Sequence, residues 1–271
     1  MSLKDKNIRF VSFSSGSSGN CSLISYNGTN ILIDAGIQYK KLVEDLEVYG
    51  LTMDDIDAIF LTHSHTDHVR AVSTILKKHK IALYGLKDTL QYIINTNNLT
   101  DEYSDYFYVL YGSEVITFNN DFEVEPISTY HDVPSVCYQI KLGDIYVAHV
   151  TDLGCFTYKM LSKFKELNVL VIEANYDPDK LDENDRYPKF LKNRIRGGDG
   201  HLSNRDCAEF INEIYTDKLE SVYLAHLSEE NNTPELALSD VTDTLSNLFE
   251  DKNLKLPTIK VLDRYNITEI I

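Results

Sequence analysis

The sequence lacks any apolar run near the roughly 18 residues that a membrane-spanning helix needs, which argues against a transmembrane protein. The stretch from Met1 to Phe10 also lacks the apolar segment of a secretory signal, so we expect a cytoplasmic protein. Cysteine is scarce, and no two cysteines form a CxxC pair. This scarcity argues against a disulfide framework and a cysteine-rich zinc finger. The cysteines are Cys21, Cys137, Cys155 and Cys207.

Positive charge is also in short supply. The 26 lysines and arginines are outnumbered by 42 aspartates and glutamates, which gives a net charge of −16 over 271 residues. Proteins that coat nucleic acid with their whole surface are usually basic, so this balance argues against broad, nonspecific coating. A local positive strip or a metal site remains compatible with it. The sequence contains no internal repeat and no long linker.

Residue periodicity predicts hairpin strands early in the chain and alternating strands and helices later. Asn27-Gly28 predicts a hairpin turn between strands 21–26 and 30–34. Ser203 is expected to cap a helix, with Asp206 near the capping-box position. This order is typical of a layered α/β domain with mixed sheets. Further strands are expected at 58–62, 81–84, 122–127, 138–142, 145–149, 169–173 and 222–225, helices at 40–49, 69–79, 204–215 and 234–249, and a mobile loop at 177–185.

The strongest chemical signal is the segment His63-Ser64-His65-Thr66-Asp67-His68, which directly follows the predicted buried strand 58–62. Imidazoles and carboxylates are ligands that suit Zn, Mn or Fe. Four potential ligands on one loop favour two adjacent metal ions over one. The carboxyl end of a strand is also where active sites of α/β proteins gather.

Two metal ions need more ligands than this loop supplies. His131, Asp152 and His226 each stand at the end of a predicted strand. Any one of them alone would be read as a turn or core residue. Their repeated placement, together with the histidine-rich loop, favours metal ligation.

These residues, in this order, resemble the metallo-β-lactamase-fold hydrolase superfamily over nearly the whole chain. Within the superfamily the sequence is similar to the YycJ (WalJ) type. The resemblance implies one domain over residues 1–271, a four-layer αββα sandwich with mixed sheets, and a dinuclear metal nuclease that degrades DNA from a 5′ end. The segments that carry it are 14–20, 32–36, 173–177, 200–204 and 226–232.

The resemblance also implies which residues hold the metals, which would be Zn, Mn or Fe. His63, His65 and His131 would bind one ion, and Asp67, His68 and His226 the other. Asp152 would bridge the two ions, because a carboxylate has two oxygens. Asp34 would orient the metal-binding loop. Water bridging such ions loses a proton near neutral pH, and the resulting hydroxide would attack phosphorus.

Glu173 and His201 resemble the glutamate and histidine of tRNase Z. The resemblance implies that His201, held by Glu173, acts as the general acid that protonates the leaving oxygen. Residues 186–204 carry five cations and one acid, which predicts a contact with the phosphate backbone through Arg194 and Arg196. The competing interpretation is a solvated amphipathic helix with Phe190, Leu191 and Ile195 in the core. Further candidate substrate contacts are Ser15, Ser17, Ser18, Asn20, Ser203 and Asn204.

The leading hypothesis is a dinuclear-metal phosphodiesterase, and specifically a 5′→3′ DNA exonuclease whose substrate carries a 5′-phosphate. A hydrolase of small esters, lactones or thioesters would suit the acidic surface better. An endonuclease that processes tRNA or other RNA is a further alternative, although no counterpart of the tRNase Z exosite arm is evident. A metal-stabilised binding module without turnover is the non-enzymatic alternative.

Overall fold

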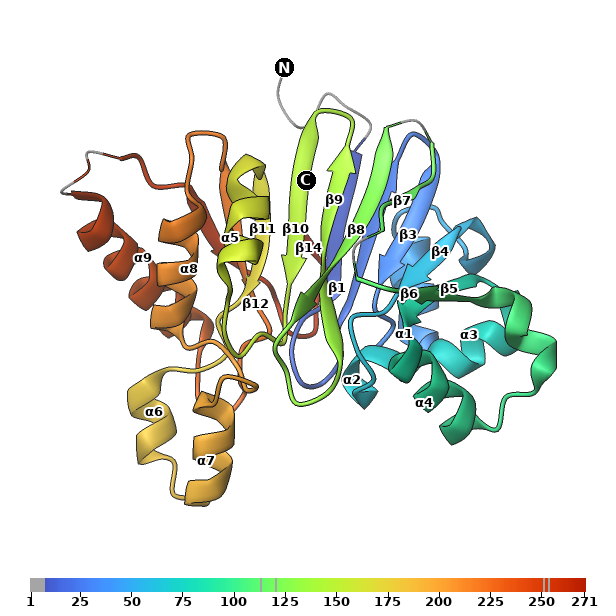
Figure 1. The fold of residues 1–271 in the computed structure, drawn as a ribbon, viewed down its shortest axis with the longest axis horizontal. Coiled ribbons are helices and arrows are strands. Elements are labelled where there is room, and N and C mark those ends of the chain that lie inside the picture. The colour runs from blue at the N-terminus through green and yellow to red at the C-terminus, as the bar shows by residue number, and fades with distance from the viewer. Residues whose placement is uncertain (1–7, 113, 120, 251, 253) are drawn as a thin grey trace. The chain divides into compact units, whose positions relative to one another are not determined.

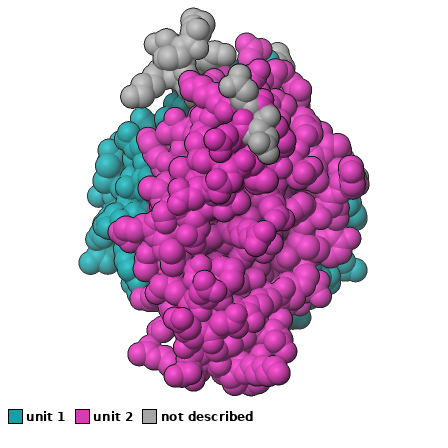
Figure 2. Space-filling view, turned by 90° about the vertical axis from the view of Figure 1, so that its left-hand side faces the viewer, with its two compact units in different colours: residues 1–126, 133–136, 263–271 teal, residues 127–132, 137–262 magenta. Residues whose placement is uncertain are grey.

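The computed structural model describes residues 8–112, 114–119, 121–250, 252 and 254–271. The chain divides into two units, which Figure 2 distinguishes by colour. Unit 1 comprises residues 1–126, 133–136 and 263–271, and unit 2 comprises residues 127–132 and 137–262. Each unit has its own core of buried apolar side chains.

Sheet A lies in unit 1 and has the strand order β14-β1-β2-β3-β4-β5-β6 (Figure 1). Its first four strands pair antiparallel, and β3 to β6 pair parallel. Asn27 and Gly28 both have positive φ, as the predicted hairpin turn between β2 and β3 requires. The strands are β1 (Ile8–Ser14), β2 (Cys21–Tyr26), β3 (Thr29–Ile33), β4 (Ala58–Phe60), β5 (Ala82–Leu86), β6 (Phe107–Leu110) and β14 (Thr268–Glu269).

The helices of unit 1 bury their apolar residues against sheet A. Leu42 of α1 and Ile75 of α3 are fully buried in one cluster with Leu23 and Leu32 of the sheet. The helices are α1 (Tyr39–Glu47), α2 (Thr66–Val69), α3 (Val72–His79) and α4 (Lys87–Asn97), with short 3₁₀ turns η2 (Met53–Asp55) and η3 (Asp101–Tyr106).

The single helix expected at 69–79 is wrong at its start, because the structure has two helices there. Ala35 is the cause: its N–H donates to the His68 carbonyl at 2.9 Å, and its carbonyl accepts from the Ala71 N–H at 2.9 Å. These bonds take the backbone groups that would have continued the helix. The short helix α2 is thereby fixed against the segment that follows β3.

Sheet B has the strand order β13-β12-β11-β10-β9-β8-β7. Strands β10 to β13 pair parallel, and β9 pairs antiparallel with β10. Strand β7 and the first part of β8 belong to unit 1. The strands are β7 (Ile116–Thr117), β8 (Phe122–Thr129), β9 (Ser135–Leu142), β10 (Ile145–Val150), β11 (Val169–Glu173), β12 (Ser221–Ala225) and β13 (Thr258–Val261).

Unit 2 packs its longer helices on the parallel strands. Phe210 of α8 and Val241 of α9 are buried with Leu170 of β11 and Leu224 of β12. The predicted capping box at Ser203 and Asp206 is confirmed at the start of α8. The helices are α5 (Tyr158–Lys163), α6 (Pro178–Glu183), α7 (Lys189–Arg196), α8 (Asn204–Ile214) and α9 (Pro234–Glu250), with the 3₁₀ turn η4 (Phe164–Glu166).

The mobile loop expected at 177–185 is wrong, because this segment forms α6. Pro178 occupies the first turn, and the Asp177 side chain accepts the Lys180 N–H at 2.7 Å as an N-cap. Helices α6 and α7 project from the rest of unit 2 (Figure 1). The expected α/β class with mixed sheets is confirmed. In the part of the chain that the structure describes, no helix is long and apolar enough to span a membrane.

Candidate metal and acid–base site

The predicted site residues follow the carboxyl ends of parallel strands in both units. In unit 1, Asp34 directly follows β3, and His63 begins the loop after β4. In unit 2, Asp152 follows β10, Glu173 ends β11, and His226 follows β12. Parallel strands end at the same sheet edge, so residues far apart in sequence are brought together within each unit.

Three of these residues have a left-handed backbone. Asp34, Asp152 and His226 have φ values of 60°, 57° and 52°. This conformation is uncommon for residues other than glycine and tends to occur at functional sites. It turns the chain sharply at each strand end, where the side chain in question makes its polar contacts.

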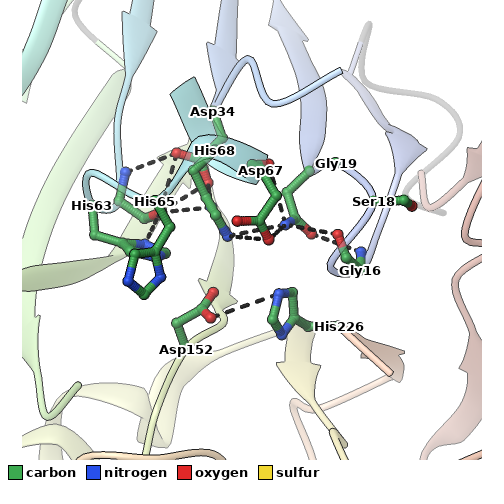
Figure 3. Close-up of polar contacts among 12 residues, drawn as sticks. Gly16, Ser18, Gly19, Asp34, His63, His65, Asp67, His68, Asp152 and His226 are labelled. Carbon is green, nitrogen blue, oxygen red and sulfur yellow. Dashed lines mark hydrogen bonds and ion pairs between the residues drawn. The ribbon is translucent and has the colours of Figure 1, made fainter. Parts of the chain in front are cut away.

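The histidine-rich loop of unit 1 brings its imidazoles into direct contact (Figure 3). His63 Nε2 lies 3.0 Å from His65 Nδ1, and the rings of His63 and His68 are 4.1 Å apart between centroids. The His63 and His68 side chains are fully buried. Such a cluster of nitrogen donors suits a divalent metal ion.

Asp34 anchors this loop through hydrogen bonds. Its Oδ1 accepts the Thr62 backbone N–H at 2.9 Å, and its Oδ2 accepts the His68 Nδ1–H at 2.7 Å. Because Nδ1 of His68 is the donor, Nε2 carries the lone pair that a metal ion needs. Asp34 and His68 are both fully buried, so the imidazole ring has a fixed orientation.

A second support comes from the loop between β1 and β2. The Asn20 backbone N–H donates to the Asp67 carbonyl at 2.8 Å. The Asn20 side-chain amide lies 3.0 Å from His68 Nε2 and 3.3 Å from Asp67 Oδ2. Asn20, a predicted substrate contact, therefore touches two predicted metal ligands.

In unit 2, Glu173 is the centre of a buried hydrogen-bond network. Its Oε2 accepts Nδ1–H groups from His201 at 2.9 Å and from His226 at 3.0 Å. The same carboxylate accepts the backbone N–H groups of Asp152 at 3.1 Å and of Leu202 at 2.8 Å. One side chain thus positions a predicted ligand, the predicted bridging residue and the predicted general acid.

The charges of this network reinforce one another. Burial alone would raise the pKa of the Glu173 carboxyl, but the imidazoles of His201 and His226 hold that pKa below its ordinary value. Burial alone would lower the pKa of His201, and the Glu173 carboxylate raises it above the ordinary value. An imidazolium at His201 beside an ionised Glu173 is therefore favoured.

The donor set of unit 2 fits a divalent metal ion. Asp152, Glu173, His201 and His226 each offer one ligand atom, and these atoms lie within 4.8 Å of one another. His131 donates its Nδ1–H to the Gly200 carbonyl at 3.1 Å, and its Nε2 lies 3.7 Å from Asp152 Oδ1. His226 Nε2 lies 3.6 Å from the same oxygen. Both histidines therefore turn their lone-pair nitrogen toward Asp152, as ligation requires.

The predicted basic strip is paired with carboxylates. Arg194 forms an ion pair with Asp132, and Arg196 forms one with Asp182. The strip lies on α7, in which no residue is buried and Phe190 is 74% exposed. The competing interpretation, which placed Phe190 in the core, is thus wrong on that point.

Ser203 and Asn204 have structural partners. The Ser203 hydroxyl donates to Asp206 and accepts its backbone N–H at 3.1 Å. The Asn204 amide donates to Asp240 at 2.9 Å and lies in a buried pair with Asn232. Both residues fix the start of α8, directly after His201.

Sequence reasoning missed Asn175 as a site residue. Its side-chain amide donates to the His226 carbonyl at 2.8 Å and lies 3.4 Å from His226 Nδ1. Thr62 was also missed, although its hydroxyl contacts Asp34, His63 and His68. The segment 173–177 carried the only signal for Asn175, and nothing in the sequence singles out Thr62.

Comparison with known proteins places this geometry in a family. The family model described as the beta-lactamase superfamily domain matches residues 29–227. Exodeoxyribonuclease YycJ of Bacillus anthracis is 30% identical over 93% of this chain and 97% of its own length. Exodeoxyribonuclease WalJ of Streptococcus pneumoniae serotype 2 (strain D39) is 31% identical over 88% of each chain.

Solved structures agree on the fold. The metallo-β-lactamase fold protein YhfI from Bacillus subtilis has a TM-score of 0.67 and 15% identity, over 98% of this chain and 100% of that chain. Human tRNase Z, short form, has a TM-score of 0.64 and 15% identity, over 96% and 98%. The resemblance expected from the histidine motif is confirmed, and the chain belongs to the metallo-β-lactamase superfamily.

Proposed function

We propose that this protein is a metal-dependent phosphodiesterase that releases nucleotides from the 5′ end of DNA. The exodeoxyribonuclease names of its relatives support the substrate and the reaction. The observation that carries the proposal is the contact of one carboxylate, Glu173, with both His201 and His226. It couples a proton donor to a metal ligand, which a phosphodiesterase needs and a purely structural metal site does not.

The proposed ligands would hold two divalent metal ions, of Zn, Mn or Fe. His63, His65 and His131 would bind one ion, Asp67, His68 and His226 the other, and Asp152 both. The fixed Nδ1–H bonds of His68, His131 and His226 support this, since each leaves Nε2 as the ligand atom. When bound, such ions activate water near neutral pH and neutralise the charge on a phosphoryl group.

His201 would protonate the leaving oxygen of the scissile phosphate. Its Nδ1–H is bonded to Glu173, so its Nε2 is the nitrogen that can deliver a proton. The raised pKa of His201 supports this role, because the Glu173 carboxylate favours the protonated ring. Its side chain is 22% exposed, so substrate can approach it.

The substrate would be DNA with a 5′-phosphate, in the cytoplasm. Ser15, Ser17 and Ser18 would face its phosphates, and Asn20 would act by holding the metal-binding loop. Ser203 and Asn204 would act by fixing the segment that carries His201. Phosphate would compete with Asp132 and Asp182 for Arg194 and Arg196. The unpaired thiols of all four cysteines agree with a reducing compartment.

The test is digestion of an end-labelled, 5′-phosphorylated DNA duplex with added Mn²⁺, by wild type and by Asp67→Ala. We expect wild type alone to release mononucleotides from the 5′ end. Cleavage of an RNA control alone would replace the proposal with RNA processing. Hydrolysis of a small ester or lactone, with neither nucleic acid cleaved in Mn²⁺ or Zn²⁺, would establish the alternative hydrolase.

A further inference from the structure

Unit 1 contains a pocket beside the 15–20 loop, and of its lining residues only Ser18 has a role in the proposed function. Its volume is about 300 Å³. It is formed by the end of β1, the 15–20 loop, the start of α1, the residue after α2, and the segment before β14. Its lining includes Ser14, Ser18, Ile37, Lys41, Arg70 and Tyr265.

The charge of this pocket is opposite to that of the chain as a whole. Lys41 and Arg70 line it, and no acidic residue does so among the described residues. Lys41 bonds the buried Asp45 at 2.8 Å, which holds its ammonium in place and offsets part of its charge. Arg70 donates one N–H to the Ser18 carbonyl at 2.7 Å, and a guanidinium has further N–H groups for an anion.

Ser18 contributes a hydroxyl group beside this pocket. Its Oγ is buried and has no hydrogen-bond partner in the described part of the chain. A buried hydroxyl without a partner costs free energy, which a phosphate oxygen at this position would recover. Ser18 and Arg70 together therefore make a donor pair for an anion.

Tyr265 supplies an aromatic surface beside these donors. Its side chain is 53% exposed. Its backbone is fixed in a turn, because the N–H groups of Tyr265 and Asn266 both donate to Asp263 Oδ1, at 2.8 and 2.9 Å. With Ile37 as apolar neighbour, this ring can stack on a nucleobase.

The pocket shares its walls with the metal-binding loop. Asn20, at the end of the 15–20 loop, contacts Asp67 and His68. Arg70 stands two residues after His68. Figure 3 shows Ser18 on the side of this loop away from the histidines. A ligand in the pocket would therefore contact the same 15–20 loop that bonds Asp67 and His68 through Asn20.

We propose that this pocket binds one nucleotide unit of the substrate strand. Its phosphate meets Arg70 and Ser18, and its base stacks on Tyr265. The assignment of the nucleotide to a DNA substrate rests on the proposed function. The pocket's own chemistry requires an anion joined to a flat apolar group.

The test is calorimetric titration of the metal-loaded protein with deoxyadenosine 5′-monophosphate, with inorganic phosphate and with deoxyadenosine. We expect the nucleotide to bind more tightly than either fragment. Tyr265→Ala and Arg70→Gln should each weaken nucleotide binding about tenfold, through lost stacking and a lost charge-assisted bond. Tyr111→Ala is the matched control, because Tyr111 is an exposed tyrosine of the same unit outside the pocket.

Metal content is measured for every variant. If Arg70→Gln loses metal, Tyr265→Ala alone decides the outcome. Nucleotide binding that is undetectable in wild type, or equally tight in Tyr265→Ala, would overturn the inference. Binding needs no hydrolysis, so the two proposals fail separately. A protein that binds the nucleotide through Tyr265 but cleaves no DNA would refute only the proposed function.

Discussion

Asp34 in unit 1 and Glu173 in unit 2 have similar positioning roles. Each is a fully buried carboxylate at or directly after a strand end, and each accepts the Nδ1–H of a proposed metal ligand, His226 or His68. Such partners fix the ring and its tautomer, and they increase the basicity of the ligating nitrogen. Glu173 differs in also accepting the Nδ1–H of His201, the proposed proton donor.

Replacing His201 by alanine separates acid catalysis from metal binding. We expect kcat to fall by about 10²- to 10⁴-fold, the usual contribution of a general acid, while metal content is unchanged. Single-turnover cleavage and metal analysis measure the two effects. His79→Ala is the matched control, because His79 bonds Asp54 and Tyr39 in unit 1, outside the site. Wild-type rates in His201→Ala would remove it as the acid.

Asp240 gives a prediction about stability and pH. Burial raises the pKa of its carboxyl above the ordinary value, and the neighbouring Asp177 raises it further, whereas the Asn204 hydrogen bond lowers it. The folded state therefore binds this proton more tightly than the unfolded state, and stability is lost as pH rises through the folded pKa. The side chain of the Asp240→Asn variant carries no charge at any pH.

The Asp240→Asn variant should consequently have a higher urea midpoint than wild type at pH 7. The advantage should shrink toward zero as pH falls below the raised folded-state pKa of Asp240, where the wild-type carboxyl is protonated. Urea unfolding at a series of pH values measures this. An advantage that is constant with pH would contradict the ionisation argument, because an uncharged packing gain would not depend on pH.

At the scale of elements, the histidine-rich loop depends on close backbone contacts. The Gly36 N–H donates to the Asn20 carbonyl at 2.8 Å, and Asn20 in turn donates to the Asp67 carbonyl. A Cβ on Gly36 would lie 1.6 Å from the Asp67 carbonyl oxygen, far inside the distance that two non-bonded atoms can approach. The absence of a side chain at Gly36 is thus what lets α2 approach the segment after β3.

Gly36→Ala should therefore displace α2 and lower metal content, with kcat falling in parallel. The matched control is Gly198→Ala, where a Cβ would meet only Cys155 Sγ at an ordinary 3.8 Å. Metal analysis of both purified variants, with circular dichroism to check folding, measures the effect. Full metal content in Gly36→Ala would show that this contact does not position Asp67 and His68.

The elements also show where sequence patterns stop being informative. The capping box of α8 was predictable because Ser203 and Asp206 act locally. The break between α2 and α3 was not, because it depends on hydrogen bonds to Ala35, more than thirty positions away. Helix α6 had a local signal in Asp177-Pro178, but the acidic composition that follows it favoured a loop.

At the scale of the whole molecule, the chain crosses between its two units four times. The crossings fall between 126 and 127, 132 and 133, 136 and 137, and 262 and 263. Two of them interrupt β8 and β9, so neither unit is a continuous segment that could be excised. The expectation of one domain over residues 1–271 therefore remains our proposal for how the chain folds.

One folding domain predicts a single calorimetric transition. Heating should unfold both units together, and the calorimetric and van't Hoff enthalpies should agree. Differential scanning calorimetry in the presence and absence of Mn²⁺ measures this, and metal should raise the transition temperature without splitting the peak. Two resolved transitions would show that the units fold independently.

The sequence predicted the ligand types and their strand-end positions because both follow from local pattern. It could not predict that Glu173 bonds His226 as well as His201, since that depends on the side-by-side pairing of β11 and β12. Nor could it predict that Arg70 and Tyr265 line the same pocket, because 195 positions separate them in sequence. Long-range strand order is the missing information in both cases.

The central proposal is that the chain holds a pair of divalent metal ions. Metal stoichiometry tests it most directly, by plasma mass spectrometry after loading with Mn²⁺ or Zn²⁺ and desalting. Wild type and the exposed control Asp54→Ala should retain two ions per chain, and Asp67→Ala and Asp152→Ala fewer. One ion or none in wild type, or two ions in both Asp67→Ala and Asp152→Ala, would contradict the claim.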